Sequence, residues 1–293
     1  MKIKKISYLL LIPLLAALLG DFCQKQTKGF RLQNAFSSYP PEQVPPALSK
    51  DEISLLQEVL PQPFYFMKKG QQCFAFLSKD GKYVLKLFRW EKLEPPFWTK
   101  WITTEKGKAL TQERRRKKEF DFTSYKVAYN ELKEETGLLF LQLEPTSQHN
   151  IPLEIYDNIG IKHVIQSGEV AFILQKRVED FAPYLTQKLL EKKDPDLYPF
   201  FKELAHLLQN RFSKQISDSD ISLEYNMGIL EGRPVLFDIG NLKFLKEPLS
   251  QKEFIQKQAE LIFTTLNKEA PDLAYFLQEE IDRITKQEPE NKL

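Results

Sequence analysis

The chain of 293 residues carries 42 Lys and Arg against 40 Asp and Glu, so its formal net charge is only +2. This near balance gives no case for nucleic-acid binding, which needs a basic surface. Two cysteines cannot build a disulfide framework, and three dispersed histidines without a Cys/His cluster make a zinc site unexpected. A hydrophobic content of 42% suffices to bury one sizeable core or two lobes.

The N-terminal segment has the pattern of a targeting sequence. Three lysines within the first five residues precede a largely apolar run, Ile6 to Leu19. This run of about fourteen residues is shorter than the ~20 needed to span a bilayer, which favours a secretory signal peptide or a short membrane anchor over residues 1–22. No A-x-A site follows, so cleavage stays open, and the large Phe22 before Cys23 argues against lipidation. We expect a membrane-associated or exported protein.

Residues 23–49 are expected to form a linker, because two Pro-Pro pairs disfavour regular structure there. The next stretch, Phe64 to Trp90, divides into three strand-like runs broken at Lys69-Gly70 and Asp80-Gly81. In the third run, alternation places Lys86 between apolar neighbours on its own face. A buried lysine needs a negative partner, so Lys86 either meets an anion or is an edge-strand lysine that reaches solvent.

The segment from Gln112 to Glu135 is polar, rich in helix formers and followed by Gly137, a good helix stop. Its carboxylates Glu131 and Glu119 are both candidates to pair with Lys86, with Glu131 preferred, although a carboxylate on so charged a helix is commonly just solvated. Two extended runs, Pro152 to Gln166 and Val170 to Gln175, follow, and the second is apolar enough to be a fully buried strand.

An amphipathic helix is predicted over Pro199 to Phe212, where His206 is assigned no chemistry. The stretch from Asn226 to Gly240 then predicts a hairpin with arms 227–230 and 235–237 around a turn at 231–234. This hairpin would bring Asn226 and Asp238 to one edge. An amide and a carboxylate oxygen beside a nucleotide suit Mg²⁺, which fills its other positions with water and phosphate. The alternative is an ordinary strand whose aspartate caps a turn.

These elements, in this order, resemble the protein-kinase-like superfamily. The resemblance rests on Lys86 in the third strand, the Glu-bearing helix, Asn226, and Asp238-Ile239-Gly240 in place of D-F-G. It implies that Lys86 binds ATP phosphates and pairs with Glu131, and that the metal ligands are Asn226 and Asp238. It further implies that Gly70 lies in the phosphate-binding loop, and that the backbone of Gln175-Lys176-Arg177 contacts adenine.

Several departures from the family pattern limit this comparison. Only Gly70 represents the glycine-rich loop, and no H-R-D occurs. The family's catalytic aspartate would fall at Ile221, so Asp220 can orient the acceptor hydroxyl only if the loop has one extra residue. About fifty residues follow Gly240, enough for helices over 249–266 and 271–285, and no A-P-E segment is visible.

We therefore expect an α+β, bilobal protein-kinase-like fold with a short helical C-terminal lobe. The expected division is a strand-rich small lobe over 50–175 and a helical large lobe over 176–293. The expected function is binding of ATP and Mg²⁺, with transfer of the γ-phosphoryl group to a hydroxyl acceptor, either a protein or a small molecule. The alternative is a catalytically inactive pseudokinase that serves as a membrane-associated or secreted binding module. A third possibility is an α+β chain without any kinase relation.

Overall fold

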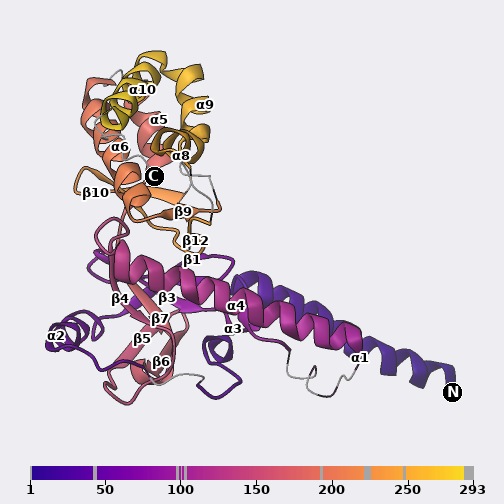
Figure 1. The fold of residues 1–293 in the computed structure, drawn as a ribbon. Helices are drawn as coiled ribbons and strands as arrows, with labels where there is room; N and C mark the ends of the chain where they lie inside the picture. Colours follow the sequence, from indigo (N-terminus) through magenta and orange to yellow (C-terminus); the bar gives the residue numbers. More distant parts are fainter. Residues whose placement is uncertain are drawn as a thin grey trace. The chain divides into compact units, whose positions relative to one another are not determined.

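The computed structural model describes residues 2–41, 45–96, 99, 101, 104–191, 194–220, 226–246 and 249–286. The chain divides into two compact units (Figure 1). The first comprises residues 1–115 and 142–173, and the second comprises residues 116–141 and 174–293. The boundaries fall inside helix α4 (Glu105–Glu131), at the end of strand β4 (Leu138–Gln142) and inside strand β7 (Phe172–Lys176).

The first unit is built on antiparallel strands. Its strands belong to a seven-stranded sheet of order β4-β7-β3-β2-β1-β5-β6, so β3 lies between β2 and β7 and is not an edge strand. Among β3, β2, β1, β5 and β6, only the β1–β5 pair is parallel. Their bounds are β1 Phe64–Lys69, β2 Cys73–Ser78, β3 Tyr83–Phe88, β5 Pro152–Tyr156 and β6 Lys162–Gln166. The three predicted strands over 64–90 are therefore confirmed. The unit also holds helices α1 (Lys2–Gln26), α2 (Lys50–Val59) and α3 (Trp90–Leu93), and short 3₁₀ turns at Leu32–Ala35 and Ser167–Glu169.

The hairpin predicted at Asp80-Gly81 is confirmed, and its turn is held by side chains. The Asp80 carboxylate accepts hydrogen bonds from the Ser78 hydroxyl at 2.6 Å and from the Lys82 amide at 3.0 Å. Gly81 has a φ of 73°, which a residue with a Cβ adopts only at a cost. The core beneath is aromatic, since Phe30 meets Phe74 and Phe76 edge to face at 5.2 and 5.4 Å.

The second unit holds the helical C-terminal part of the chain, where α5, α6, α8, α9 and α10 gather in one body (Figure 1). Their bounds are α5 Phe181–Leu190, α6 Tyr198–Ser213, α8 Gln251–Gln258, α9 Glu260–Glu269 and α10 Pro271–Thr285. A 3₁₀ turn precedes α6 at Asp194–Leu197. The helix predicted over 199–212 is confirmed as α6, and its expected apolar face is buried.

Two further helix predictions need correction. The single helix expected over 249–266 is two helices, because Ala259 leaves the helical conformation at φ −97°, ψ 6° between α8 and α9. The helix expected over 112–135 runs from Glu105 to Glu131, so it starts about two turns earlier and stops about one turn sooner. After its end the chain continues in turns to Gly137, whose φ is 62°. Gly137 ends that turn rather than the helix.

Two small sheets complete the second unit. One has the order β11-β10-β8, with β8 Glu179–Asp180, β10 Met227–Leu230 and β11 Arg233–Leu236, and the other pairs β9 (Ile216–Asp218) with β12 (Leu242–Phe244). The predicted hairpin is present, but its turn is only Glu231-Gly232, with φ of 53° and 80°. Pro234 therefore lies in β11, where an edge strand tolerates the missing amide donor. The α+β class with a helical C-terminal part is thus confirmed.

Candidate metal and nucleotide site

The β10–β11 hairpin brings Asn226 and Asp238 to one end. The carbonyl oxygen of Asn226 accepts hydrogen bonds from the amides of Phe237 at 3.0 Å and Asp238 at 3.3 Å, directly beyond the last strand pair. The Asn226 side chain is 8% exposed, whereas Asp238 lies at the surface. Within the described part of the chain, the buried Nδ2 of Asn226 has no hydrogen-bond partner.

Helix α4 holds the loop that follows Asp238. The fully buried Ser124 hydroxyl donates to the Ile239 carbonyl at 2.5 Å and accepts from the Leu242 amide at 2.7 Å. On the other side, Ser219 donates to the Asn241 carbonyl through both its amide, at 3.1 Å, and its hydroxyl, at 2.9 Å. The loop from Ile239 to Leu242 is therefore held by hydrogen bonds from α4 and from Ser219.

Asp220 lies beside a second acidic residue that the sequence reasoning missed. Its amide donates to Oδ1 of Asp218 at 2.8 Å, and Asp218 is 4% exposed. Burial is the main reason why the pKa of Asp218 rises to about 6. The charges of Asp220 and Asp238 contribute to this rise, while the charge of Arg211 and the hydrogen bond from the Asp220 amide oppose it. Asp220 and Asp238 therefore both lie within electrostatic reach of Asp218. The Ser-Asp-Ser-Asp run was visible in the sequence, but burial of the first aspartate was not.

Two predicted site residues belong to the first unit: Lys86 lies in β3, and Gly70 lies between β1 and β2. Lys86 pairs with Ala75 in mid-strand and is half-buried, as the alternation predicted. Gly70 closes the β1–β2 turn: its amide donates to the Cys73 carbonyl at 2.8 Å, and its own carbonyl accepts from Nη1 of Arg89 at 2.8 Å. The Gly70 amide is therefore already used within the hairpin.

The carboxylates on α4 differ in their surroundings. Glu131, the preferred partner for Lys86, is exposed at the last residue of the helix, and Glu119 is exposed as well. Asp121 was overlooked, yet it is 2% exposed, and burial raises its pKa to about 6 while Lys117 opposes this. Its Oδ2 has no hydrogen-bond partner among the described residues. The pairing of Lys86 stays a prediction.

Part of the segment expected to contact adenine, residues 175–177, is used in hydrogen bonds within the protein. Gln175 is 2% exposed, and its Nε2 donates to the Thr136 carbonyl at 2.8 Å and to the Phe237 carbonyl at 3.4 Å. Gln175 thereby holds the residue just before Asp238. Arg177, in contrast, is exposed. The side chain of Gln175 is thus committed to the protein, and the Lys176 amide also donates within the protein, to the Gly137 carbonyl at 2.8 Å.

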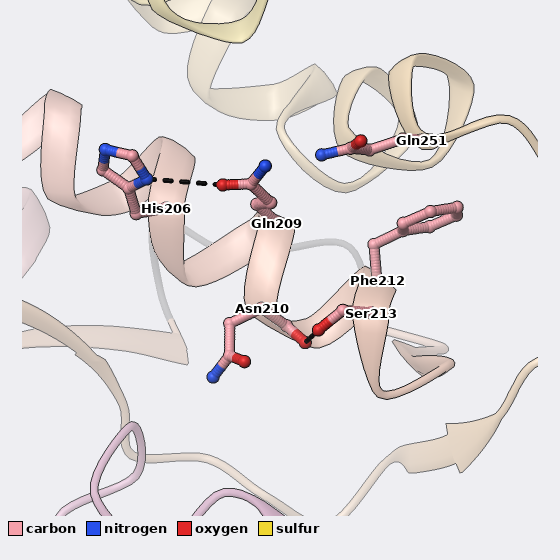
Figure 2. Close-up of a pocket in the computed structure, with 6 residues that line it drawn as sticks. All are labelled: His206, Gln209, Asn210, Phe212, Ser213 and Gln251. Carbon is pink, nitrogen blue, oxygen red and sulfur yellow. Dashed lines mark hydrogen bonds between the residues drawn. The ribbon is translucent and has the colours of Figure 1, made fainter. Parts of the chain in front are cut away.

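A depression of about 300 Å³ lies apart from these residues, beside α6 and the start of α8 (Figure 2). It is lined by His206, Gln209, Asn210, Phe212, Ser213 and Gln251. Its polar groups bond to protein: Nδ1 of His206 lies 3.4 Å from Oε1 of Gln209, and Ser213 donates to the Asn210 carbonyl at 2.8 Å. No predicted site residue lines it.

Comparison with known proteins gives a limited result. No family model and no curated protein matches the chain. Among solved structures, a crystal structure of WbdD is similar at 13% identity with a TM-score of 0.35, covering 76% of this chain and 46% of that one. A second, described as the bifunctional kinase-methyltransferase WbdD, has 14% identity and a TM-score of 0.33, covering 75% and 44%. The chain thus spans less than half the length of these structures, and similarities this low carry no conclusion about activity.

Two features of the described residues bear on the expected metal site and on the expected membrane association. Within the described ranges, no group of three or more His, Cys, Asp or Glu side chains is arranged to hold a metal ion. A site built from Asn226 and Asp238 does not need such a group, because Mg²⁺ keeps several waters and phosphate oxygens. None of the helices, as far as their residues are described, has an apolar stretch long enough to cross a membrane.

Proposed function

We propose that this protein binds ATP and Mg²⁺ in a kinase-like manner and transfers the γ-phosphoryl group to a hydroxyl acceptor. The observation that carries the proposal is the junction at the end of the β10–β11 hairpin. There the Asn226 carbonyl ties down Asp238, and Ser124 anchors the loop beyond it. An amide and an exposed carboxylate are thus held at one edge, with Asp218 and Asp220 nearby.

The donor set fits the proposed ligand. The orphaned amide nitrogen of Asn226 can donate to a phosphate oxygen as it stands, and turning the amide over presents its oxygen to a cation instead. Asp238 supplies a charged oxygen. When bound, Mg²⁺ would neutralise phosphate charge and so favour attack at the γ-phosphorus.

The residues then take distinct parts in the reaction. Lys86 contacts phosphate oxygens and is itself held by a carboxylate, with Glu131 still the proposed one. Asp220 accepts the acceptor's hydroxyl proton while that oxygen forms a bond to the γ-phosphorus. The bond from that phosphorus to the β–γ bridging oxygen breaks, and ADP leaves. The backbone of residues 175–177, including Arg177, borders adenine.

One observation favours the alternative of a non-catalytic binding module. Kinase-type phosphate loops cradle phosphates with free glycine amides. Here the Gly70 amide donates to Cys73, and Arg89 holds the carbonyls of Gly70 and Gln71 at 2.8 and 3.3 Å. A loop closed in this way weakens phosphate positioning, which would allow nucleotide binding with slow or no turnover.

The experiment measures binding and turnover separately on the full-length protein. We expect ATP with Mg²⁺ to raise the melting temperature of the wild type, and Asp238→Asn to abolish that rise. Glu134→Gln, at an exposed carboxylate of the same unit, is the control and should behave as the wild type. Release of ³²P-labelled product, absent in Asp238→Asn, supports the enzyme, whereas binding without product supports the alternative. Equal, positive responses from wild type and Asp238→Asn would reject the proposed metal site, and no response to ATP with Mg²⁺ in either protein would reject the enzyme and favour the non-catalytic module.

We also propose that α1 directs the protein to a membrane. The helix runs from Lys2 to Gln26, and Leu15, Leu18, Leu19 and Phe22 are 50–62% exposed. Such exposed apolar residues favour a lipid surface. Fractionation of cells expressing the full chain should place it with membranes, and Leu15→Gln combined with Leu18→Gln should release it. An unchanged distribution of that double variant would contradict the proposal.

A further inference from the structure

The second unit contains a buried cation that the proposed reaction does not use directly. Arg211, near the end of α6, has no exposed surface. Its Nη2 donates to the Gln258 side chain at 2.9 Å, while Nε and Nη1 have no hydrogen-bond partner within the described part of the chain. A buried guanidinium costs several kcal/mol unless a negative group compensates it, so its retention here calls for an explanation.

The compensating negative group is Asp218. The charges of Arg211 and Asp218 attract, which opposes the effect of burial on both groups: burial lowers the pKa of Arg211 to about 10 and raises that of Asp218 to about 6. Gln258 connects them. Its side-chain oxygen accepts from Arg211 and, at 3.3 Å, from the Asp218 amide, and its Nε2 donates to the Asp218 carbonyl at 3.3 Å.

Asp218 in turn holds the acidic loop. Its Oδ1 accepts from the Asp220 amide at 2.8 Å, and a carboxylate acceptor makes this bond stronger than a neutral one would be. The chain of hydrogen bonds therefore runs from Arg211 in the helical core, through Gln258 and Asp218, to the residue proposed to orient the acceptor hydroxyl.

We infer that Arg211 is a positioning residue: its buried positive charge holds the Asp218 carboxylate, which fixes the backbone of Asp220. The role assigned to Asp220 rests on the proposed function, but the positioning itself does not. Arg211 touches neither nucleotide nor acceptor in this scheme. It acts only through Asp218.

Hydrogen exchange of single amides tests this in the full-length protein. In Arg211→Met we expect the Asp220 amide to exchange about tenfold faster, as for loss of one charge-assisted bond. The Leu242 amide, held by Ser124, is the internal reference and should keep its rate. Arg211→Lys keeps the charge and should restore most of the Asp220 protection. If Arg211 had only a general structural role, the amides of both Asp220 and Leu242 would exchange faster in Arg211→Met.

A second background separates the charge effect from packing. Asp218→Asn keeps an acceptor for the Asp220 amide but removes the charge, so Arg211→Met should add no further acceleration there. An unchanged Asp220 rate in Arg211→Met, or the same acceleration in both backgrounds, would overturn the inference. If Arg211→Met does not fold, two other variants decide. Faster exchange of the Asp220 amide in Asp218→Asn, with protection preserved in Arg211→Lys, supports the inference. Equal exchange rates in the wild type and Asp218→Asn overturn it.

The same variants distinguish this inference from the proposed function. If the wild type binds ATP with Mg²⁺, Arg211→Met should weaken binding or turnover while Arg211→Lys retains them. If the wild type binds no nucleotide, the proposed function fails, and the exchange of the Asp220 amide still decides whether Arg211 positions this loop.

Discussion

Replacing Ser124 by alanine should loosen the loop after Asp238 more than any comparable hydroxyl deletion in the second unit. The Ser124 hydroxyl satisfies the Ile239 carbonyl and the Leu242 amide, at 2.5 and 2.7 Å, and both of those residues are 1% exposed. Ser124→Ala leaves two buried backbone groups unpaired. At about 1–3 kcal/mol for each, we expect the free energy of unfolding to fall by about 2–6 kcal/mol.

The matched control is Ser213→Ala. Ser213 also donates to a backbone carbonyl, that of Asn210 at 2.8 Å, but it is exposed at the end of α6, so water replaces the lost bond. Its effect should stay within about 0.5 kcal/mol. Guanidinium denaturation followed by circular dichroism measures both variants. Equal destabilisation by Ser124→Ala and Ser213→Ala would refute the argument that Ser124 bridges two otherwise unsatisfied groups.

Two further predictions concern the second unit. The pKa of Asp121 rises from 3.8 to about 6 on folding. Between pH 3.8 and 6 the folded state therefore binds a proton that the unfolded state has lost, and the free energy of unfolding falls as the pH rises through this range. At neutral pH the loss is about 3 kcal/mol. Asp121→Asn should therefore stabilise the protein at pH 7.5 and not at pH 4, whereas the control Glu134→Gln should have the stability of the wild type at both. Denaturation curves at the two pH values measure this. A Cβ at Gly228 would lie 2.5 Å from the Val178 side chain, so Gly228→Ala should lower the free energy of unfolding by about 1–3 kcal/mol. The control is Gly232→Asn, at a position with open space and a φ of 80°, which should lower it by less than about 0.5 kcal/mol. Similar melting temperatures for the two variants would contradict this prediction.

Elements set by neighbouring residues were predictable from the sequence. The Asp80-Gly81 hairpin formed as expected, because an aspartate that bonds nearby backbone and a glycine with positive φ act within a few residues. The hairpin after Asn226 was also predicted, but its turn was expected to be four residues long, 231–234, whereas it has only two. Glu231 adopts the left-handed conformation with φ of 53°, which its residue type does not favour, so nothing local indicated a two-residue turn.

Helix boundaries were less predictable, since propensity changes gradually along polar segments. α4 begins at Glu105, directly after Thr104, whose hydroxyl accepts a hydrogen bond from the Gly107 amide at 3.3 Å and so caps the first turn. The prediction missed this start signal. The break at Ala259, in contrast, follows no glycine or proline. Burial on α4 also differed from expectation: the carboxylate that folding encloses is Asp121, while the favoured Glu131 remains exposed. Which carboxylate becomes buried depends on what packs against the helix, and periodicity alone does not supply that.

By itself, the sequence determined the local pieces of this protein: the strand runs around Lys86, the amphipathic helix over 199–212, and an Asn and an Asp at the ends of one hairpin. Only the tertiary structure decided which side chains support them. Arg211, Gln258 and Asp218 come from three separate elements, and Ser124 reaches a loop more than a hundred residues later. The physical reason is that such partners are selected by burial and by the need to pair every enclosed polar group, and both conditions exist only once distant segments have packed together.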